Sequence, residues 1–311
     1  MKVYDSHAHI TMEGFIPEAY EDGMARTMRL VMKNKFNIDM TLIQAREDLI
    51  KGMYDPGGKK LLEVHKQAGI NKTVIFGSDF GVEIGDPAIS VFESNKIYAE
   101  LAKEHPDRFV ALCAIDPRRR GAMRHVEQCM EEWGMRGLKM HPAAGFYPTD
   151  QVLYPFYEKC ADWGVPIVFH SGAQPAAPVY LDTQRPCFIA EAASRFPNTK
   201  MIIAHVAMDL WVEAVMFGKL IPNVYFDLSY HQATYVTRGP QRFFEWIREL
   251  INECGAGKLL WGTDTPLPSA LLPDDQYVKA FLDSYKQGLF TEEEMEMMMW
   301  RNTAEVFGIP D

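Results

Sequence analysis

Two histidines stand two residues apart in the stretch Asp5-Ser6-His7-Ala8-His9, close to the start of the chain. Successive side chains of a β-strand point to opposite faces, so His7 and His9 would lie on the same side. Neutral imidazole is the commonest metal-binding side chain, and two imidazoles on one strand make half of a metal site. An H-x-H triplet also arises by chance. The stretch therefore predicts a metal site only if other segments supply further ligands.

Four later segments end in a similar way. Each is apolar up to its last one to three residues and then presents a side chain that can bind a metal or move a proton. These side chains are Lys139 and His141 after 137–138, His170 after 167–169, His205 after 201–204, and Asp264 after 259–261 and a Gly-Thr pair. If the segments are parallel strands of one barrel, these side chains meet at its C-terminal rim, where barrels of this type carry their chemistry.

The elements that must position these side chains are eight short segments rich in β-branched and apolar residues. They are Val3–His9, Thr73–Phe76, Phe109–Cys113, Gly137–Met140, Pro166–Phe169, Met201–Ala204, Val224–Asp227 and Leu259–Trp261. Helical patterns lie between them, the clearest over 150–163. This alternation predicts an α/β fold of the (β/α)8 or TIM-barrel type. An open doubly wound sheet is the alternative, but no glycine-rich phosphate loop follows any segment.

One interval is about twice the usual length. The segment from about 10 to 58 carries apolar residues at helical spacing, so we expect a helical insertion after the first strand that forms a wall or lid over the site. No domain linker is evident, and we expect residues 1–311 to form a single domain. The chain should end in a helix over 291–307, capped by Thr291 and Glu294.

Composition narrows the class of protein. The 311 residues are 47% hydrophobic and 24% charged, as in a globular protein with a large core, and the net charge of −10 argues against nucleic-acid binding. No apolar run is long enough to span a membrane. The five cysteines form no C-x-x-C pair, and no targeting segment precedes the first strand, so we expect reduced thiols and a cytoplasmic location.

The chain resembles the amidohydrolase superfamily, and more narrowly the amidohydrolase-related branch that contains aminocarboxymuconate-semialdehyde decarboxylase. The resemblance covers nearly the whole chain, apart from the insertion. The matching stretches are Asp5–His9, 105–109, the Gly-Leu-Lys-Met-His-Pro run at 137–142, Phe-His-Ser-Gly at 169–172, Ala204-His205, Gly-Thr-Asp-Thr-Pro at 262–266, and Asn-Thr-Ala at 302–304.

That resemblance implies one divalent metal ion, most plausibly zinc with manganese as an alternative, held by His7, His9, His170 and Asp264. The ion would generate hydroxide at neutral pH, and Asp264 would accept and return its proton. His205 would act as a general acid, base or electrostatic stabiliser. In some members of the superfamily the lysine equivalent to Lys139 is carboxylated and bridges two metals; the single-metal reading, with an unmodified lysine, is preferred here.

The remaining polar residues are candidates for substrate binding or support. Lys139 could pair with a substrate carboxylate, or with Asp5 or Asp79. His141 could face the site or anchor a loop, and the other candidates for substrate contact are His231 and Arg185. His65, His105 and His125 are expected in helices or loops outside the active rim.

Three functions compete. The first is a metal-dependent hydrolase, in which metal-bound hydroxide attacks an amide, lactone or ester-type bond of a small, carboxylate-bearing substrate. The second is a metal-dependent, non-oxidative decarboxylase of an unsaturated or aromatic acid. The third, a barrel that only binds a ligand, is disfavoured because every expected ligand residue is present. A small molecule is the expected partner, and a homodimer is possible.

Overall fold

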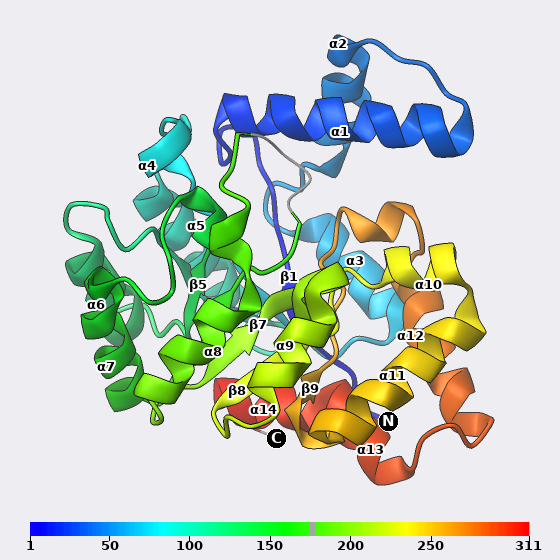
Figure 1. Ribbon diagram of the computed structural model, residues 1–311. Coiled ribbons are helices and arrows are strands. Elements are labelled where there is room, and N and C mark those ends of the chain that lie inside the picture. Colours follow the sequence, from blue (N-terminus) through cyan, green and yellow to red (C-terminus); the bar gives the residue numbers. More distant parts are fainter. Residues whose placement is uncertain (174–177, 311) are drawn as a thin grey trace.

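Strands of two to five residues, alternating with helices, build the framework of the computed structural model, which describes residues 1–173 and 178–310. The strands are short because each one is buried on both faces and spans the height of the barrel only once. Figure 1 shows the helices ringing the strands. The strands are β1 Tyr4–Ala8, β2 Lys72–Ile75, β3 Phe109–Ala111, β4 Cys113–Ala114, β5 Leu138–Met140, β6 Ile167–Phe169, β7 Met201–Ile203, β8 Val224–Asp227 and β9 Leu259–Leu260.

All neighbouring strands run parallel, in the order β1-β2-β3 and β4 to β9. β3 and β4 are two parts of one strand interrupted at Leu112, whose N–H donates to Ile75 while the next N–H, of Cys113, donates to Gly137. The ring closes between β9 and β1, where the N–H of Ser6 donates to the carbonyl of Trp261 over 3.0 Å. The predicted eight-stranded parallel barrel is therefore confirmed.

The helices cover the outside of the barrel with amphipathic faces, as α11 does with Phe243, Ile247 and Leu250 buried. The predicted helix over 150–163 is present as a short 3-10 turn followed by α7, and Gly164 ends it with a φ of 68°. The helices are α1 Glu18–Phe36, α2 Leu42–Gln44, α3 Lys59–Ala68, α4 Gly81–Ile84, α5 Val91–Glu104, α6 Ala122–Glu131, α7 Tyr154–Trp163, α8 Pro186–Arg195, α9 Trp211–Gly218, α10 Gln232–Arg238, α11 Pro240–Cys254, α12 Asp274–Lys286, α13 Glu292–Glu296 and α14 Asn302–Phe307.

Side chains inside the barrel alternate with side chains that pack against the outer helices. Val168, Ile202 and Leu260 belong to the inner cluster, which α14 closes at the bottom with Val306 and Phe307. This cluster fills the N-terminal half of the barrel and leaves the C-terminal half to polar side chains. Within the described ranges, 1–173 and 178–310, no helix is both long and apolar enough to cross a membrane.

The segment between β1 and α3 is helical, as predicted. It contains α1, α2 and a π-helical turn, Ala45–Ile50. In Figure 1, α1 lies across the upper end of the barrel with α2 above it. Arg46 joins the π-helical turn to α1, because its guanidinium lies 3.1 Å from Glu18 and 3.0 Å from Asp22 on that helix.

The C-terminal helix is capped as the sequence predicts. The Thr291 hydroxyl accepts from the N–H of Glu294, and the Glu294 carboxylate accepts from the N–H of Thr291. α13 is joined to α14 by a π-helical turn, Met297–Arg301, so the predicted helix over 291–307 is nearly continuous.

Candidate active site

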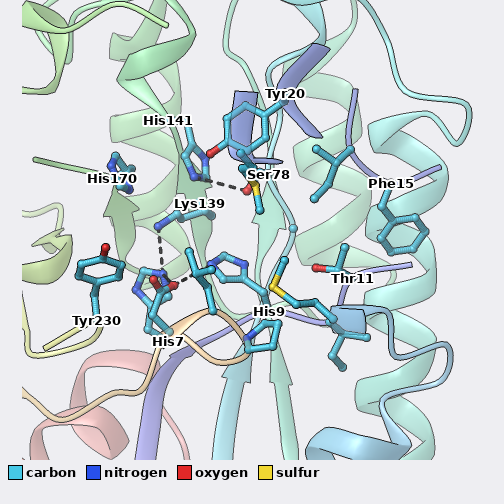
Figure 2. Close-up of a pocket in the computed structure, with 18 of the residues that line it drawn as sticks. His7, His9, Thr11, Phe15, Tyr20, Ser78, Lys139, His141, His170 and Tyr230 are labelled. Atoms are coloured by element: carbon cyan, nitrogen blue, oxygen red, sulfur yellow. Dashed lines mark hydrogen bonds and ion pairs between the residues drawn. The ribbon is translucent and has the colours of Figure 1, made fainter. Parts of the chain in front are cut away.

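A cavity of about 120 Å³ opens at the C-terminal rim, and seven of the nine predicted site residues line it. These seven are His7, His9, Lys139, His141, His170, His205 and Asp264. Figure 2 shows the imidazoles and the lysine converging from the strand ends. The opposite wall comes from the insertion, which contributes Phe15, Ile16, Tyr20, Met24, Ile50 and Met53. The cavity thus has a polar floor and a largely apolar wall.

Strand geometry explains the polar floor. Val168 faces the barrel interior, so His170, two residues later, leaves the strand on the same side. Tyr225 packs against the inner cluster, and Asp227 has the same parity. The prediction that polar strand ends converge at one rim holds because parallel strands place their carboxyl ends at one edge.

His7, His9 and Asp264 form the tightest group in the cavity. The Asp264 carboxylate oxygen Oδ1 lies 3.3 Å from Nε2 of His7 and 3.1 Å from Nε2 of His9. The backbone holds the strands together at this point, since the N–H of Asp264 donates to the carbonyl of His7 over 2.8 Å. Three ligand-type atoms therefore face one point between β1 and β9.

In both imidazoles, the hydrogen bond made by Nδ1 decides which of the two ring nitrogens carries the proton. Nδ1 of His7 lies 2.9 Å from the Asp227 carboxylate, and Nδ1 of His9 lies 2.9 Å from the carbonyl oxygen of Phe76. A carbonyl and an ionised carboxylate can only accept, so both Nδ1 atoms donate. When each imidazole carries a single proton, on Nδ1, its Nε2 presents a lone pair to the carboxylate of Asp264.

Lone pairs facing a carboxylate at close range repel one another unless a cation lies between them. Two ligand atoms about 2.1 Å from a tetrahedral zinc ion would be about 3.4 Å apart, close to the separations of Asp264 from His7 and His9. The protonated Nδ1 atoms on carboxylate and carbonyl partners are also the usual support of metal-binding histidines. The residues present therefore fit a divalent metal ion.

His170 lies on the same rim but outside this tight group. Its Nε2 is buried and has no hydrogen-bond partner, and its ring stacks on that of His141 at a centroid distance of 5.4 Å. Burial, reinforced by Lys139, lowers the pKa of His170 well below its ordinary value, so the ring is neutral. An unpartnered buried nitrogen of this kind is available to a ligand.

A hydrogen-bonded chain that the sequence analysis missed orients His205. The Ser229 hydroxyl donates to Oδ1 of Asp227, so its oxygen accepts from Nδ1 of His205 over 2.8 Å. Burial lowers the pKa of His205 well below its ordinary value. His205 is therefore a neutral imidazole whose Nε2 lone pair is free to accept a proton in the cavity.

Asp227 connects this chain to the group around Asp264, because its second oxygen, Oδ2, accepts from His7. His7, His205 and Asp227 also form a group with metal-ligand geometry of its own. Asp227 is bonded directly to Nδ1 of His7 and through the Ser229 hydroxyl to Nδ1 of His205, so we read this group as support for the two imidazoles. The signal for Asp227 was present in the sequence: it is a carboxylate at the end of a predicted strand.

The backbone after β7 is strained in a way that sequence patterns do not reveal. His205, Val206, Ala207 and Met208 all have positive φ values, between 46° and 59°. Non-glycine residues in this region cost roughly 1–3 kcal/mol each and persist only where surrounding contacts hold them. Such strain is typical of functional sites.

His231 supplies one of those contacts and is not a substrate contact. Its Nε2 donates to the carbonyl of His205 over 2.8 Å, and its Nδ1 accepts from the hydroxyl of Thr234 over 2.9 Å. Both ring nitrogens are used, and His231 is not among the described residues that line the cavity. The prediction that it reaches the substrate is corrected: its ring supports the strained segment.

The buried imidazole of His231 makes stability depend on pH. Burial lowers its pKa to about 4 from an ordinary 6.5. Between these values the unfolded chain binds a proton that the folded chain does not, so stability falls as the pH falls, by up to about 3 kcal/mol. We expect His231→Gln, which keeps a donor but cannot titrate, to lose less stability than wild type between pH 7 and 4.5. Chemical unfolding of metal-free protein at both pH values measures this, and parallel losses in the two proteins would refute it.

Lys139 is buried on the floor of the cavity. Its Nζ lies 3.4 Å from Nε2 of His7, and burial lowers its pKa to about 8, an effect that Asp227 and Asp264 partly offset. Lys139 therefore remains mostly charged at neutral pH. The suggested partners Asp5 and Asp79 are occupied elsewhere, by the Thr263 hydroxyl and by the guanidinium of Arg119. The ammonium is thus available to an anionic group in the cavity.

The last two predicted contacts differ in outcome. His141 lines the cavity, with Nε2 3.4 Å from the Ser78 hydroxyl and with a buried Nδ1 that has no partner. Arg185 is exposed, pairs with Glu213 at 2.9 Å, and is not among the described lining residues. The proposed contact of Arg185 with substrate is therefore not supported, because its charge is engaged on the outer surface.

A parallel barrel whose C-terminal rim gathers five imidazoles, a lysine and a carboxylate defines the class: a barrel enzyme with a site for a divalent metal. The Amidohydrolase family matches residues 4–309, and the chain belongs to this family. A 2-keto-4-carboxy-3-hexenedioate hydratase of Sphingobium sp. is 24% identical in an alignment of length 274 that covers 75% of this chain and 77% of the hydratase.

Solved structures share the fold at lower identity. The 5-carboxyvanillate decarboxylase of Sphingomonas paucimobilis has a TM-score of 0.69 and 15% identity, with 99% of each chain covered. A dihydroxybenzoic acid decarboxylase of Polaromonas sp., solved with manganese and 2-nitroresorcinol, has a TM-score of 0.65 and 16% identity, with 99% of this chain and 97% of that one covered. These structures confirm the barrel; both are decarboxylases by name, whereas the Sphingobium relative is a hydratase.

Proposed function

We propose that the protein is a metal-dependent hydrolase that cleaves an amide, lactone or ester-type bond in a small substrate bearing one carboxylate. The observation that carries this proposal is the presence of proton acceptors at the predicted metal group. A hydrolase needs a base that takes a proton from water; the Asp264 carboxylate is placed for that step beside Nε2 of His7 and His9, and His205 presents a second, neutral acceptor to the cavity. An aromatic decarboxylase needs instead a group that gives a proton to carbon.

His7, His9, His170 and Asp264 would hold the metal, with zinc the first choice for three nitrogens and one carboxylate. Manganese is the alternative, supported by the ion in the dihydroxybenzoic acid decarboxylase. A bound ion of this kind polarises carbonyl oxygens and lowers the pKa of water toward about 7. We keep a single ion and an unmodified Lys139, whose ammonium can then pair with an anionic group of the substrate in the cavity.

The side chains of the site then have separate roles in the reaction. Asp264 accepts a proton on its carboxylate as water attacks the carbonyl carbon, and returns it to the leaving group. His205 accepts or donates a proton at Nε2 on the other side of the substrate, while Ser229 and Asp227 keep Nδ1 protonated. Lys139 binds the substrate carboxylate through its ammonium.

The walls of the cavity limit the charge of the substrate. Among the described lining residues, Lys139 is the only lysine or arginine, and the insertion contributes mostly aliphatic and aromatic side chains. The name of the Sphingobium hydratase specifies a hexenedioate with a further carboxy group. A single ammonium and one metal ion would poorly neutralise three carboxylates, so we propose a substrate with one carboxylate and an apolar body.

Metal removal provides a direct test of the centre. Purified protein is expected to contain close to one divalent ion per chain, and dialysis against a chelator should remove both the ion and the activity. Adding back zinc or manganese should restore the activity. Elemental analysis measures the ratio: two ions per chain would overturn the single-metal assignment, and none after supplementation would refute the proposed centre.

The reaction itself is tested by a screen of lactones, esters, amides and aromatic or unsaturated carboxylic acids. Titration of released acid and detection of carbon dioxide are recorded together. We expect acid release from a lactone or ester, or release of an amine from an amide, which frees no net acid at neutral pH, in each case without carbon dioxide.

A non-oxidative decarboxylase is the second candidate, and one observation favours it. The apolar residues of the insertion would exclude water from a carboxylate placed beside Lys139, and loss of hydration promotes the departure of carbon dioxide. Carbon dioxide released in step with substrate loss would replace the hydrolase with this function.

A further inference from the structure

The backbone of Asp264 is in the left-handed region, with φ at 60°. This conformation turns its carboxylate back toward the imidazoles of His7 and His9. The left-handed region is uncommon for residues other than glycine, although aspartate tolerates it better than most, so contacts from its neighbours help to hold it. The neighbouring residues, Thr263 and Thr265, are where that help is found.

On one side, Asp5 holds Thr263. The two Asp5 carboxylate oxygens accept from the Thr263 N–H over 3.0 Å and from its hydroxyl over 2.6 Å. The same carboxylate accepts from the N–H of His7 over 3.0 Å, which ties the turn to β1. Asp5 is completely buried, so these bonds are not weakened by water.

On the other side, Asp274 at the start of α12 holds Thr265. Its carboxylate accepts from the Thr265 hydroxyl over 2.7 Å and from the Ser269 hydroxyl over 2.5 Å. The two threonines are also joined to each other, because the N–H of Thr265 donates to the hydroxyl of Thr263 over 3.1 Å. Asp264 is therefore clamped from both sides.

His65, on α3, lies between the two clamping carboxylates. Its Nε2 is 3.6 Å from Asp5 and 3.3 Å from Asp274, and the side chain is only 1% exposed. Its Nδ1 is 2.7 Å from the hydroxyl of Thr73 on β2. No aligned hydrogen bond joins Nε2 to either carboxylate, so His65 acts on both at ion-pair distance, in a buried setting where charged groups need neighbours that compensate them.

We propose that His65 is a positioning residue: by bridging Asp5 and Asp274, it locks Thr263 and Thr265 and thereby fixes the turn that aims Asp264 at His7 and His9. His65 does not line the cavity, so it acts through the threonines. The inference rests on the proposed function in that Asp264 is taken as a metal ligand and proton carrier.

The first test is the affinity for zinc, measured by competition with a chromophoric chelator. Loss of groups that support metal ligands commonly costs 10–100-fold in affinity. We expect His65→Leu to weaken zinc binding at least about tenfold and to lower kcat more than it changes KM, and His65→Gln, which keeps one donor, to recover part of both. His105→Leu is the control, because among the described residues His105 neither lines the cavity nor belongs to a group with metal-ligand spacing.

If His65→Leu does not fold, Thr265→Val replaces it, since valine has nearly the shape of threonine without the hydroxyl. We expect the same loss of zinc affinity. Wild-type affinity and wild-type kcat in a folded His65→Leu or Thr265→Val variant would overturn the inference.

A crystallographic readout separates this inference from the proposed function. Metal-free wild type should keep Asp264 at a φ near 60°, and Thr265→Val should release it. That result would support the inferred role of the threonines in holding Asp264, even if the wild-type protein binds no zinc. An unmoved Asp264 in the variant would refute the clamp even if the metal site is correct.

Discussion

Replacing Asp264 with asparagine is expected to lower kcat/KM by about a thousandfold, within the 10²–10⁴ range for loss of a positioned proton carrier. Asparagine has nearly the same shape, so the turn held by Thr263 and Thr265 should remain. The carboxylate charge opposite Nε2 of His7 and His9 is lost, however. Metal content should therefore fall together with activity, and both are measured on the same preparation.

A suitable control is Asp209→Asn. Asp209 follows β7, is 92% exposed and pairs with Arg238 on the surface. Its replacement should leave metal content and kcat/KM unchanged. A folded Asp264→Asn variant with wild-type turnover would remove Asp264 from the mechanism, whatever its metal content.

Hydrophobic periodicity predicted the barrel because each strand is buried on both faces and reads as a short apolar run. It also predicted the floor of the site. A polar residue at the end of such a run must either reach the rim or remain buried without a partner. His170 and Lys139 therefore marked the C-terminal edge before any distance was known.

Other parts of the site depend on contacts between segments that are far apart in the sequence. Ser229 becomes important only because the fold places it between Asp227 and His205. His231 follows the same strand as Asp227 and was expected at the substrate, but its ring turns toward the carbonyl of His205. Arg185 carries the positive charge that could bind an anionic substrate group, but the fold pairs it with Glu213. Residue type alone could not distinguish these outcomes.

The insertion was predicted as helices over the rim, and its chemical contribution is clear only from the structure. Periodicity identified apolar residues in this segment without showing that Phe15, Met24 and Met53 would face the cavity and not a helix–helix contact. The resulting asymmetry, with ligands on the strands and apolar side chains on the insertion, separates the two tasks. In the proposed function, the strands would hold the reacting groups and the insertion would select the substrate.

His205→Gln is expected to have the second-largest effect, a loss of kcat of about 10²–10³-fold, with a normal metal content. Glutamine can keep a contact with the Ser229 hydroxyl but cannot exchange a proton near neutral pH. This separates His205 from Asp264, whose replacement should lower both quantities. Single-turnover rates and elemental analysis measure the two effects.

Ser229→Ala tests the same assignment through orientation. Without the hydroxyl, Nδ1 of His205 loses its 2.8 Å partner, and the ring can rotate or change the nitrogen that carries its proton. We expect a smaller loss of kcat than in His205→Gln, and no further loss when Ser229→Ala is added to His205→Gln, because residues that act through one another are not additive. Full additivity would mean that Ser229 acts independently of His205, and an active His205→Gln variant would leave Asp264 as the only proton carrier of the site.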